Sequence, residues 1–371
     1  MDVYNPVLDC EFALKIIQKD KFDLIEMDAS FELRGKPNQF LNEYYGIIDE
    51  SPFLFVAMQF ANMKTLSVIS KYPRIHLPSY TFRALMKQTL EGIRVFHEEN
   101  FIHGDIKCDN ILLHSPLGSG RVYIKISDFG FAKKIDQKNE QQYAAGTRPY
   151  MSPELFQKPV IVTQKVDIYA IGITFYHLIT HKYPVNERNF KDQGKKLAKL
   201  KSIDRPSEIK NDILWDLLSK MLEFDPNKRI TASEALQHPY FTSPEAKADI
   251  SLKQKELAYL TICAQQNGQL WIQENDMNSS FIIDEQEIQK FLIEDNIQIK
   301  LKQQQQNEQD DKLAKEIQLL KEKKKEKQRK FNEQEDYLPN KYDSQGDNFI
   351  EVENDIEMNE DDQLEIALKL S

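Results

Sequence analysis

The sequence predicts an α+β protein with two lobes, a small antiparallel β-sheet followed by a larger helical part. Three segments with alternating or β-branched residues are predicted strands: EFALKII (11–17), FLNEYYGIID (40–49) and FLFVAMQF (53–60). Three longer segments with apolar residues at helical spacing follow, at 80–100, 164–182 and 211–224. Since the strands precede the helices instead of alternating with them, we expect two lobes with a ligand site in the cleft between them.

Charge and composition divide the chain near residue 242. Residues 1–242 carry 32 Lys and Arg against 30 Asp and Glu, whereas residues 243–371 carry 17 against 29, so the net charge of −10 belongs to the second part. We therefore predict a globular domain at 1–242, an extension without a readable role at 243–300 and a charged low-complexity linker at 301–359. The acidic tail is expected to be mostly disordered or helical, because sequences such as LLKEKKKEKQRK (319–330) are typical of a solvated helix. A short helix is predicted at 360–371.

Several classes of protein are disfavoured by the composition. The three cysteines, Cys10, Cys108 and Cys263, have no CxxC spacing, so neither a disulfide framework nor a zinc site is indicated. The longest apolar stretch, IYAIGITFYHLI (168–179), is too short to span a bilayer, and the start of the chain has no signal-peptide pattern. We expect a cytoplasmic protein, with a nuclear location left open, and neither a nucleic-acid nor a membrane partner.

Polar residues gather in two short predicted loops. HGDIKCDN (103–110) stands between two apolar runs, and SDFG (127–130) follows the short strand-like segment VYIKI (122–126). Mg²⁺ takes oxygen ligands, so Asn110 and Asp128 are candidate metal ligands. Asp105 is the candidate base that accepts the proton of an attacking hydroxyl group, and Lys107 is the candidate cation beside the moving phosphoryl group. Taken singly, a residue such as Asp105, Asn110 or Asp128 is more often a solvated loop residue than a catalytic one. Together they predict phosphoryl transfer from a magnesium nucleotide.

The order of the motifs resembles the eukaryotic-type serine/threonine protein kinase family. HGDIKCDN is similar to the family's catalytic loop, DFG (128–130) to its metal-binding turn and GTRPYMSPE (146–154) to the end of its activation segment. VDIYAIG (166–172) is similar to the buried central helix, and DPNKRITASEALQHPYF (225–241) to the closing helices. The resemblance covers roughly residues 1–242 and implies a bilobal protein-kinase-like fold.

This resemblance implies roles for further residues. Asp167 is expected to brace the catalytic loop, and Glu154 is expected to form a structural ion pair with Arg229. Lys107 together with Thr147 is similar to the pattern of the serine/threonine branch of the family. The implied substrates are therefore serine and threonine hydroxyl groups of proteins.

An ATP site in the small lobe is implied by the same resemblance. Lys15 corresponds to the phosphate-binding lysine of the family, and Glu26 is its expected partner, with Glu32 as the alternative. The residues expected to line the nucleotide pocket are Ala13, Met58, Ala61 and Leu112.

One departure from the family pattern concerns the N-terminal part. A glycine-rich loop should precede the Lys15 strand and place backbone amides over the phosphates. Residues 1–12 contain no glycine. The expectation is a chain that begins inside the family's second strand, either through truncation or because the protein works without this loop, and weaker nucleotide binding follows from it.

A second departure is Gly104, at a position where many family members have an arginine that binds a phosphate on the activation loop. Between Asp128 and Gly146 the only hydroxyl side chain is that of Tyr143. The sequence thus lacks both the arginine that would bind the phosphate and a serine or threonine in this loop that would carry it. We therefore expect an activity that is not switched by phosphorylation of this loop.

The last residues, NEDDQLEIALKLS (359–371), resemble the ubiquitin-interacting motif. On a helix, one face would carry Leu364, Ala367, Leu368 and Ser371, behind an acidic first turn. The resemblance implies that this apolar stripe binds the hydrophobic patch of ubiquitin. The alternative is an amphipathic helix that docks on the kinase-like domain of its own chain.

Two hypotheses of function follow. One is an active serine/threonine protein kinase that uses ATP and Mg²⁺. The alternative is a pseudokinase-type scaffold that binds ubiquitinated partners, with nucleotide binding impaired by the missing glycine-rich loop. The presence of Lys15, Asp105, Asn110 and Asp128 favours the enzyme.

Overall fold

The computed structural model describes residues 2–5, 10–22, 25–33, 38–135, 146–160, 162–268 and 272–335. The chain divides into two compact units, Met1–Leu301 and Lys302–Ser371. The first unit contains both lobes and the candidate site. The predicted tail helix at 360–371 lies outside the described residues.

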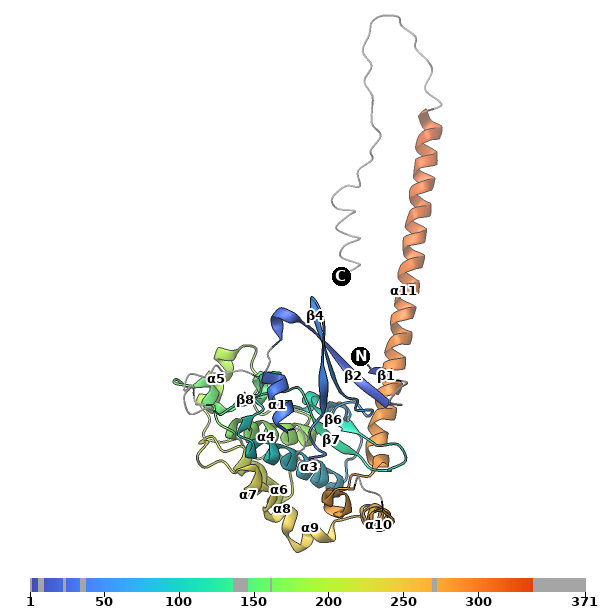
Figure 1. Ribbon diagram of the computed structural model, residues 1–371. Helices are drawn as coiled ribbons and strands as arrows, with labels where there is room; N and C mark the ends of the chain where they lie inside the picture. The colour runs from blue at the N-terminus through green and yellow to red at the C-terminus, as the bar shows by residue number, and fades with distance from the viewer. Residues whose placement is uncertain are drawn as a thin grey trace, which may run out of the picture. The chain divides into compact units, whose positions relative to one another are not determined.

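The small lobe is an antiparallel sheet of four strands with one helix. Its elements are β1 (Asp2–Asn5), β2 (Cys10–Gln18), α1 (Ile25–Leu33), β3 (Tyr44–Glu50) and β4 (Phe53–Gln59). The strand order is β1-β2-β4-β3, so β1 and β3 lie at opposite edges and β4, the last of the four in sequence, lies inside the sheet (Figure 1). β2 pairs with β4 in a register that sets Ala13 opposite Met58 and Lys15 opposite Val56. Because side chains alternate across a strand, Ala13 and Lys15 share one face of the sheet.

The strand predicted at 40–49 begins four residues later than expected, at Tyr44. Phe40 and Leu41 are 0% and 6% exposed, and Leu41 forms a parallel bridge with Ile126 of the large lobe. Their apolar character therefore reflects burial between the lobes rather than strand formation, a distinction that the residue pattern alone does not make.

The large lobe is mainly helical. Its helices are α2 (Ser67–Ser70), α3 (Ser79–Glu98), α4 (Lys165–Thr180), α5 (Phe190–Ala198), α6 (Asp212–Met221), α7 (Ala232–Leu236) and α8 (Pro239–Thr242). Two short antiparallel strand pairs join them, β5 (Phe101–Ile102) with β8 (Lys133–Lys134) and β6 (Ile111–His114) with β7 (Tyr123–Ile126). These pairs carry the loops that contain the candidate catalytic residues. They lie between the small-lobe sheet and α3 and α4 (Figure 1).

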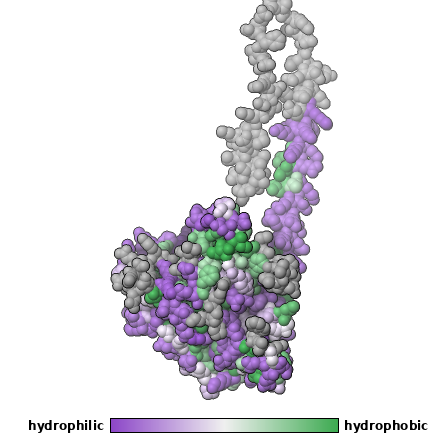
Figure 2. Space-filling view, viewed as in Figure 1, coloured by the Kyte–Doolittle hydropathy of each residue, from purple (hydrophilic) through white to green (hydrophobic). Residues whose placement is uncertain are grey.

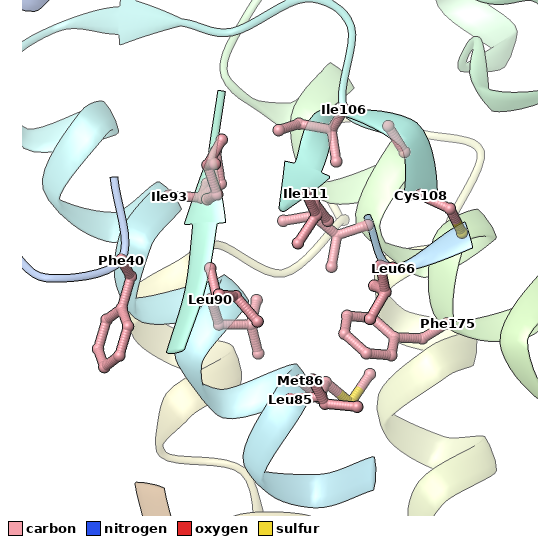
Figure 3. Packing of buried hydrophobic residues seen from close by; sticks show 14 of the residues in the cluster. Phe40, Leu66, Leu85, Met86, Leu90, Ile93, Ile106, Cys108, Ile111 and Phe175 are labelled. Atoms are coloured by element: carbon pink, nitrogen blue, oxygen red, sulfur yellow. The ribbon is translucent and has the colours of Figure 1, made fainter. Parts of the chain in front are cut away.

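One hydrophobic core spans the helical lobe and the base of the small lobe. α3 buries one apolar stripe, whereas α4 is buried on nearly all sides, as its apolar sequence predicts. Figure 3 shows side chains that fill this core, among them Leu85, Met86, Leu90, Ile93, Ile106, Ile111 and Phe175. Burial of each such side chain contributes roughly 1.5–3 kcal/mol. The loop that carries Asp105, the candidate base, is therefore anchored in this core, through Ile106 among others.

The extension after residue 242 belongs to the same compact unit as the two lobes. It contains α9 (Pro244–Ala248), α10 (Leu252–Gln266) and the first part of α11 (Glu285–Glu335). The Phe281 ring stacks on Phe40 with centroids 5.9 Å apart, and the Phe281 carbonyl accepts a hydrogen bond from Gln88 Nε2 at 2.6 Å. The Val122 amide donates to the Ile283 carbonyl at 2.9 Å. The segment 243–300, to which the sequence assigns no role, is thus part of the folded lobes.

The second unit begins within α11. Residues 302–330 that were predicted to belong to a linker are helical, and their described side chains are almost all exposed. Figure 2 shows a mainly hydrophilic surface along this part of α11. No helix in the described ranges, α11 included, is both long and apolar enough to cross a membrane.

Lys125 of β7 gives a test of the packing through pH. The residue is 6% exposed, and burial lowers the pKa of its amine to about 8, with Glu43 and Asp276 acting in the opposite direction. Between pH 8 and the ordinary value of 10.5 the unfolded chain binds more protons at this residue than the folded chain, so the free energy of unfolding should rise with pH in this window. We expect Lys125→Met to remove this rise and to be more stable than the wild type at pH 7.

The Lys125 prediction is checked by urea unfolding at pH 7 to 10 for the wild type, for Lys125→Met and for a matched control, Lys199→Met, at an exposed lysine. The control should keep the pH dependence of the wild type. Parallel curves for Lys125→Met and the wild type would contradict the prediction.

Candidate active site

The carboxylate of Asp105 is held by four hydrogen bonds. Asp105 lies in the loop after β5 and is 4% exposed. Its Oδ1 accepts from the Thr147 amide at 2.8 Å and from Thr147 Oγ1 at 2.7 Å. Its Oδ2 accepts from Lys107 Nζ at 2.6 Å and from Asn110 Nδ2 at 3.1 Å. The structure thus brings three of the predicted site residues together, with Thr147, and fixes the direction of the carboxylate.

Asp167, on the first turn of α4, braces this loop from below. Its carboxylate, 1% exposed, accepts from the backbone amides of His103 and Gly104, both at 2.9 Å, and is 2.8 Å from His97 Nε2. Burial raises the pKa of Asp167, but the hydrogen bond and charge of His97 outweigh it, so the pKa lies below its ordinary value. The expected bracing is present. The part played by His97, which lies at the end of α3, has no motif in the sequence.

Gly104 has a structural reason to be glycine. Its φ is +80°, a conformation that residues with a Cβ rarely adopt, and an added Cβ would lie 2.9 Å from the Phe131 carbonyl oxygen. Gly146 approaches it closely, because a Cβ on Gly146 would lie 2.7 Å from the Gly104 carbonyl oxygen. The residues between 136 and 145, including Tyr143, lie outside the described ranges. Independence from phosphorylation of this loop therefore stays a prediction.

Lys15, Glu26 and Asp128 form a charged triad between the small-lobe elements β2 and α1 and the loop after β7. Lys15 Nζ is 2.9 Å from Glu26 Oε1 and 2.7 Å from Asp128 Oδ1. Burial lowers the pKa of Lys15, but Glu26 and Asp128 outweigh it and the pKa is raised. Burial raises the pKa of Asp128, but the hydrogen bond and the charge of Lys15 have a larger, opposite effect. The pKa of Asp128 is therefore below its ordinary value. Lys15 and Asp128 stabilise each other's charge, so these two groups remain ionised near neutral pH.

Glu26, on α1, is the partner of Lys15, whereas the alternative Glu32 pairs with Lys134 at 2.5 Å. Glu26 is 3% exposed and faces the cleft, while Glu32 is exposed on the same helix. The helix periodicity thus selects between the two carboxylates.

Tyr44 is a site residue that the sequence analysis missed. Its hydroxyl accepts a hydrogen bond from the Asp128 amide at 3.1 Å and donates to Glu26 Oε1 at 3.3 Å. Its ring packs on Phe129 with centroids 5.1 Å apart. Asp128 itself has φ 67°, an uncommon backbone conformation for a residue other than glycine. Tyr44 thus ties the strained turn to the helix that carries Glu26.

The oxygen atoms of Asn110 and Asp128 fit a magnesium site. The Asn110 amide donates through Nδ2 to the Asp105 carbonyl at 2.9 Å, which leaves its Oδ1 for another ligand. Lys15 Nζ donates to Oδ1 of Asp128 at 2.7 Å. Among the described residues no three His, Cys, Asp or Glu side chains form a metal cluster. A site with one carboxylate and phosphate oxygens is the kind that Mg²⁺ prefers.

The residues predicted to line the nucleotide pocket come from both lobes and from the segment that connects them. Ala13 and Met58 are opposite each other in neighbouring strands. Leu112, in β6, pairs with Thr65 across an antiparallel bridge. Ala61 lies between β4 and Thr65, in the segment that connects the lobes. Small-lobe and large-lobe residues of the predicted pocket thus come from elements that meet at this connection.

The fold and the site together define the class of this protein. It has a two-lobed protein-kinase-like fold, with Lys15 on the sheet of the small lobe and Asp105 held in a loop of the large lobe. The sequence profile described as "Protein kinase domain" matches residues 3–241. The chain therefore belongs to the protein kinase domain family.

Named relatives of the chain include protein kinases of Dictyostelium discoideum. The chain is 30% identical over 247 residues to "Serine/threonine-protein kinase dst2" of Dictyostelium discoideum, a match that covers 64% of this chain and 21% of that protein. It is 34% identical over 235 residues to "Probable cyclin-dependent kinase 8" of the same organism, which covers 51% of this chain and 60% of that protein. The chain thus spans less than two thirds of the length of these relatives.

The fold has a counterpart among solved structures. A chain in the "Crystal Structure of the yeast RNA Pol II CTD kinase CTDK-1 complex" superposes with a TM-score of 0.57 at 21% sequence identity, covering 65% of this chain and 89% of that chain. At this identity the likeness shows the fold alone.

Proposed function

We propose that this chain is a serine/threonine protein kinase that transfers the γ-phosphoryl group of ATP to hydroxyl groups of proteins. The observation that carries the proposal is the combination of a carboxylate held by four donors, Asp105, with the ion-paired triad of Lys15, Glu26 and Asp128. A fixed carboxylate can orient and deprotonate an acceptor hydroxyl group, and a fixed lysine can bind phosphates.

The residues divide the work between them. Asp105 would accept the proton of the acceptor hydroxyl, and Lys107, 2.6 Å from that carboxylate, would offset negative charge on the transferred group. Asn110 and Asp128 would hold Mg²⁺, and Lys15 would bind phosphate oxygens. Magnesium ATP, when bound, supplies the phosphoryl group.

Serine and threonine are the proposed acceptors. Lys107 Nζ donates to Thr147 Oγ1 at 2.8 Å, so the lysine and the threonine of the predicted branch pattern are in contact beside Asp105. Relatives that match the chain are themselves named serine/threonine-protein kinases. Both observations support the serine/threonine branch.

The test is transfer of radiolabelled phosphate from ATP, with Mg²⁺, to a generic protein substrate, followed by phosphoamino-acid analysis. The wild type should label serine and threonine, and Asp128→Asn should weaken magnesium-dependent nucleotide binding in calorimetry. Nucleotide binding without transfer by the wild type would favour the scaffold alternative. Label on tyrosine alone would overturn the serine/threonine assignment.

We further propose recruitment through ubiquitin by the tail. The support is the sequence pattern alone, with Leu364, Ala367 and Leu368 on one helical face behind an acidic turn, since these residues lie outside the described ranges. A short single helix buries little area, so a weak affinity, roughly sub-millimolar, is expected. Ala367→Trp should abolish binding by steric clash.

The ubiquitin prediction is checked by NMR titration of labelled ubiquitin with the full chain and with Ala367→Trp. Shifts at the hydrophobic patch of ubiquitin are expected for the wild type only. A matched control, Lys369→Ala, alters the tail outside the apolar stripe and should keep the shifts. Shifts that persist in Ala367→Trp would favour the docking helix instead.

A further inference from the structure

Asp295 is a buried carboxylate that no motif explains. It lies on α11, beyond the residues 3–241 that match the family, and is 5% exposed. Its Oδ2 is 2.8 Å from Lys64 Nζ, and its Oδ1 accepts from the Tyr72 hydroxyl at 2.6 Å and lies 3.7 Å from Lys71 Nζ. The three partners all lie just after the segment that connects the two lobes.

Lys64 is strained at that point. Its φ is 63°, in the left-handed region that favours glycine. Its amine is held on both sides by α11, through Asp295 and through Asn296 Oδ1 at 3.0 Å. A strained backbone persists when its surroundings over-determine it, and such residues gather at functional sites. The contacts with α11 are part of the surroundings that hold Lys64 in this conformation.

Lys64 is coupled to Leu112, a residue predicted to line the nucleotide pocket; we call this part of the pocket its floor. The Met63 amide donates to the Leu113 carbonyl, and the Leu113 amide donates to the Lys64 carbonyl, both at 2.9 Å. Thr65 bridges Leu112 between these bonds. A change in the backbone conformation of Lys64 would therefore shift Leu112 relative to Ala61, which lies in the segment that connects the two lobes.

The anchor on α11 is rigid. Phe291 and Ile288, about one and two turns before Asp295, are both 0% exposed and belong to the main hydrophobic core. Burial raises the pKa of Asp295, but Lys64 and Tyr72 outweigh it, so the pKa lies below its ordinary value and the carboxylate is charged near neutral pH. A charged, buried group on a fixed helix holds its partners in one position.

We infer that Asp295 is a positioning residue for the nucleotide: through Lys64 it fixes the segment 63–65 and, through that segment, the pocket floor at Leu112. This inference rests on the proposed kinase function. It assigns to the extension at 243–300 a role in ATP binding, and it places a determinant of that binding outside the residues that match the family.

The test separates positioning from general stability. Asp295→Ala should raise the KM and the Kd for magnesium ATP about tenfold. The kcat should stay within about twofold of the wild type, because the substitution leaves the loop that carries Asp105 unchanged. Lys64→Gly in the Asp295→Ala background should restore the affinity, because glycine adopts φ 63° without the contacts with α11.

A matched control is Asp249→Ala, which breaks another ion pair of the extension, with Arg83, that has no contact with the segment 63–65. It should leave the Kd unchanged. Thermal unfolding of every variant shows whether folding is kept, and Asp295→Asn is the substitute if Asp295→Ala does not fold.

The outcomes are distinct. An unchanged Kd in a folded Asp295 variant, or a lost affinity that Lys64→Gly does not restore, would overturn the inference and leave the proposed function standing. A wild-type protein that binds no nucleotide would overturn the proposed function and this inference with it.

Discussion

Asp105→Asn should reduce phosphoryl transfer by at least about a hundredfold while leaving nucleotide binding almost unchanged, since general base catalysis typically contributes 10²–10⁴-fold. Asparagine has the shape of aspartate but cannot take up the proton of the acceptor hydroxyl. Lys15 and Asp128, which are assigned to the nucleotide and the metal, keep their own ion pair at 2.7 Å. Binding and turnover should therefore separate, in calorimetry with magnesium ATP and in a radiolabel transfer assay.

The control for this variant is Asp109→Asn, in the same loop. Asp109 is exposed, whereas Asp105 is 4% exposed and holds four donors. The control should retain most of the transfer activity. If Asp105→Asn transferred phosphate at the wild-type rate, the assignment of Asp105 as the base would be wrong.

The parts of the fold that the sequence predicts are those with a local pattern. The buried helix α4 follows from its apolar residues on every side, and the amphipathic helix α3 from its single apolar stripe. Asp105, Asn110 and Asp128 are recognisable because they stand at fixed spacing in loops next to short strands. The choice of Glu26 over Glu32 also follows from periodicity, once Lys15 is placed on the facing strand.

What the sequence does not reveal depends on contacts between distant segments. Tyr44 reads as an ordinary strand residue, and only the fold brings its hydroxyl to Asp128, 84 positions later. Asp295 stands 231 positions after Lys64, in the segment 243–300, to which the sequence assigns no role. Composition describes the average of such a segment, whereas the ion pair depends on the few residues that the core buries.

Arg229→Met should lower the free energy of unfolding by about 3–5 kcal/mol, because it leaves a buried carboxylate without its partner. The side chain of Arg229 has 0% exposure, and its guanidinium donates to both oxygens of Glu154, at 2.6 and 2.9 Å. It also donates to the backbone carbonyls of Glu223 and Lys165, at 2.8 and 2.7 Å. Urea unfolding measures the loss.

Two further variants show whether the uncompensated charge is the cause. Lys228→Met, at the neighbouring residue with a side chain 75% exposed, should change the free energy of unfolding by less than about 1 kcal/mol. Combining Arg229→Met with Glu154→Leu removes both charges and should recover part of the stability, since a buried ion pair is often replaceable by apolar residues. Recovery should stay incomplete, because the carbonyls of Glu223 and Lys165 lose their donor. A double variant no more stable than Arg229→Met would show instead that the lost hydrogen bonds to these carbonyls, and not the charge of Glu154, make Arg229 indispensable.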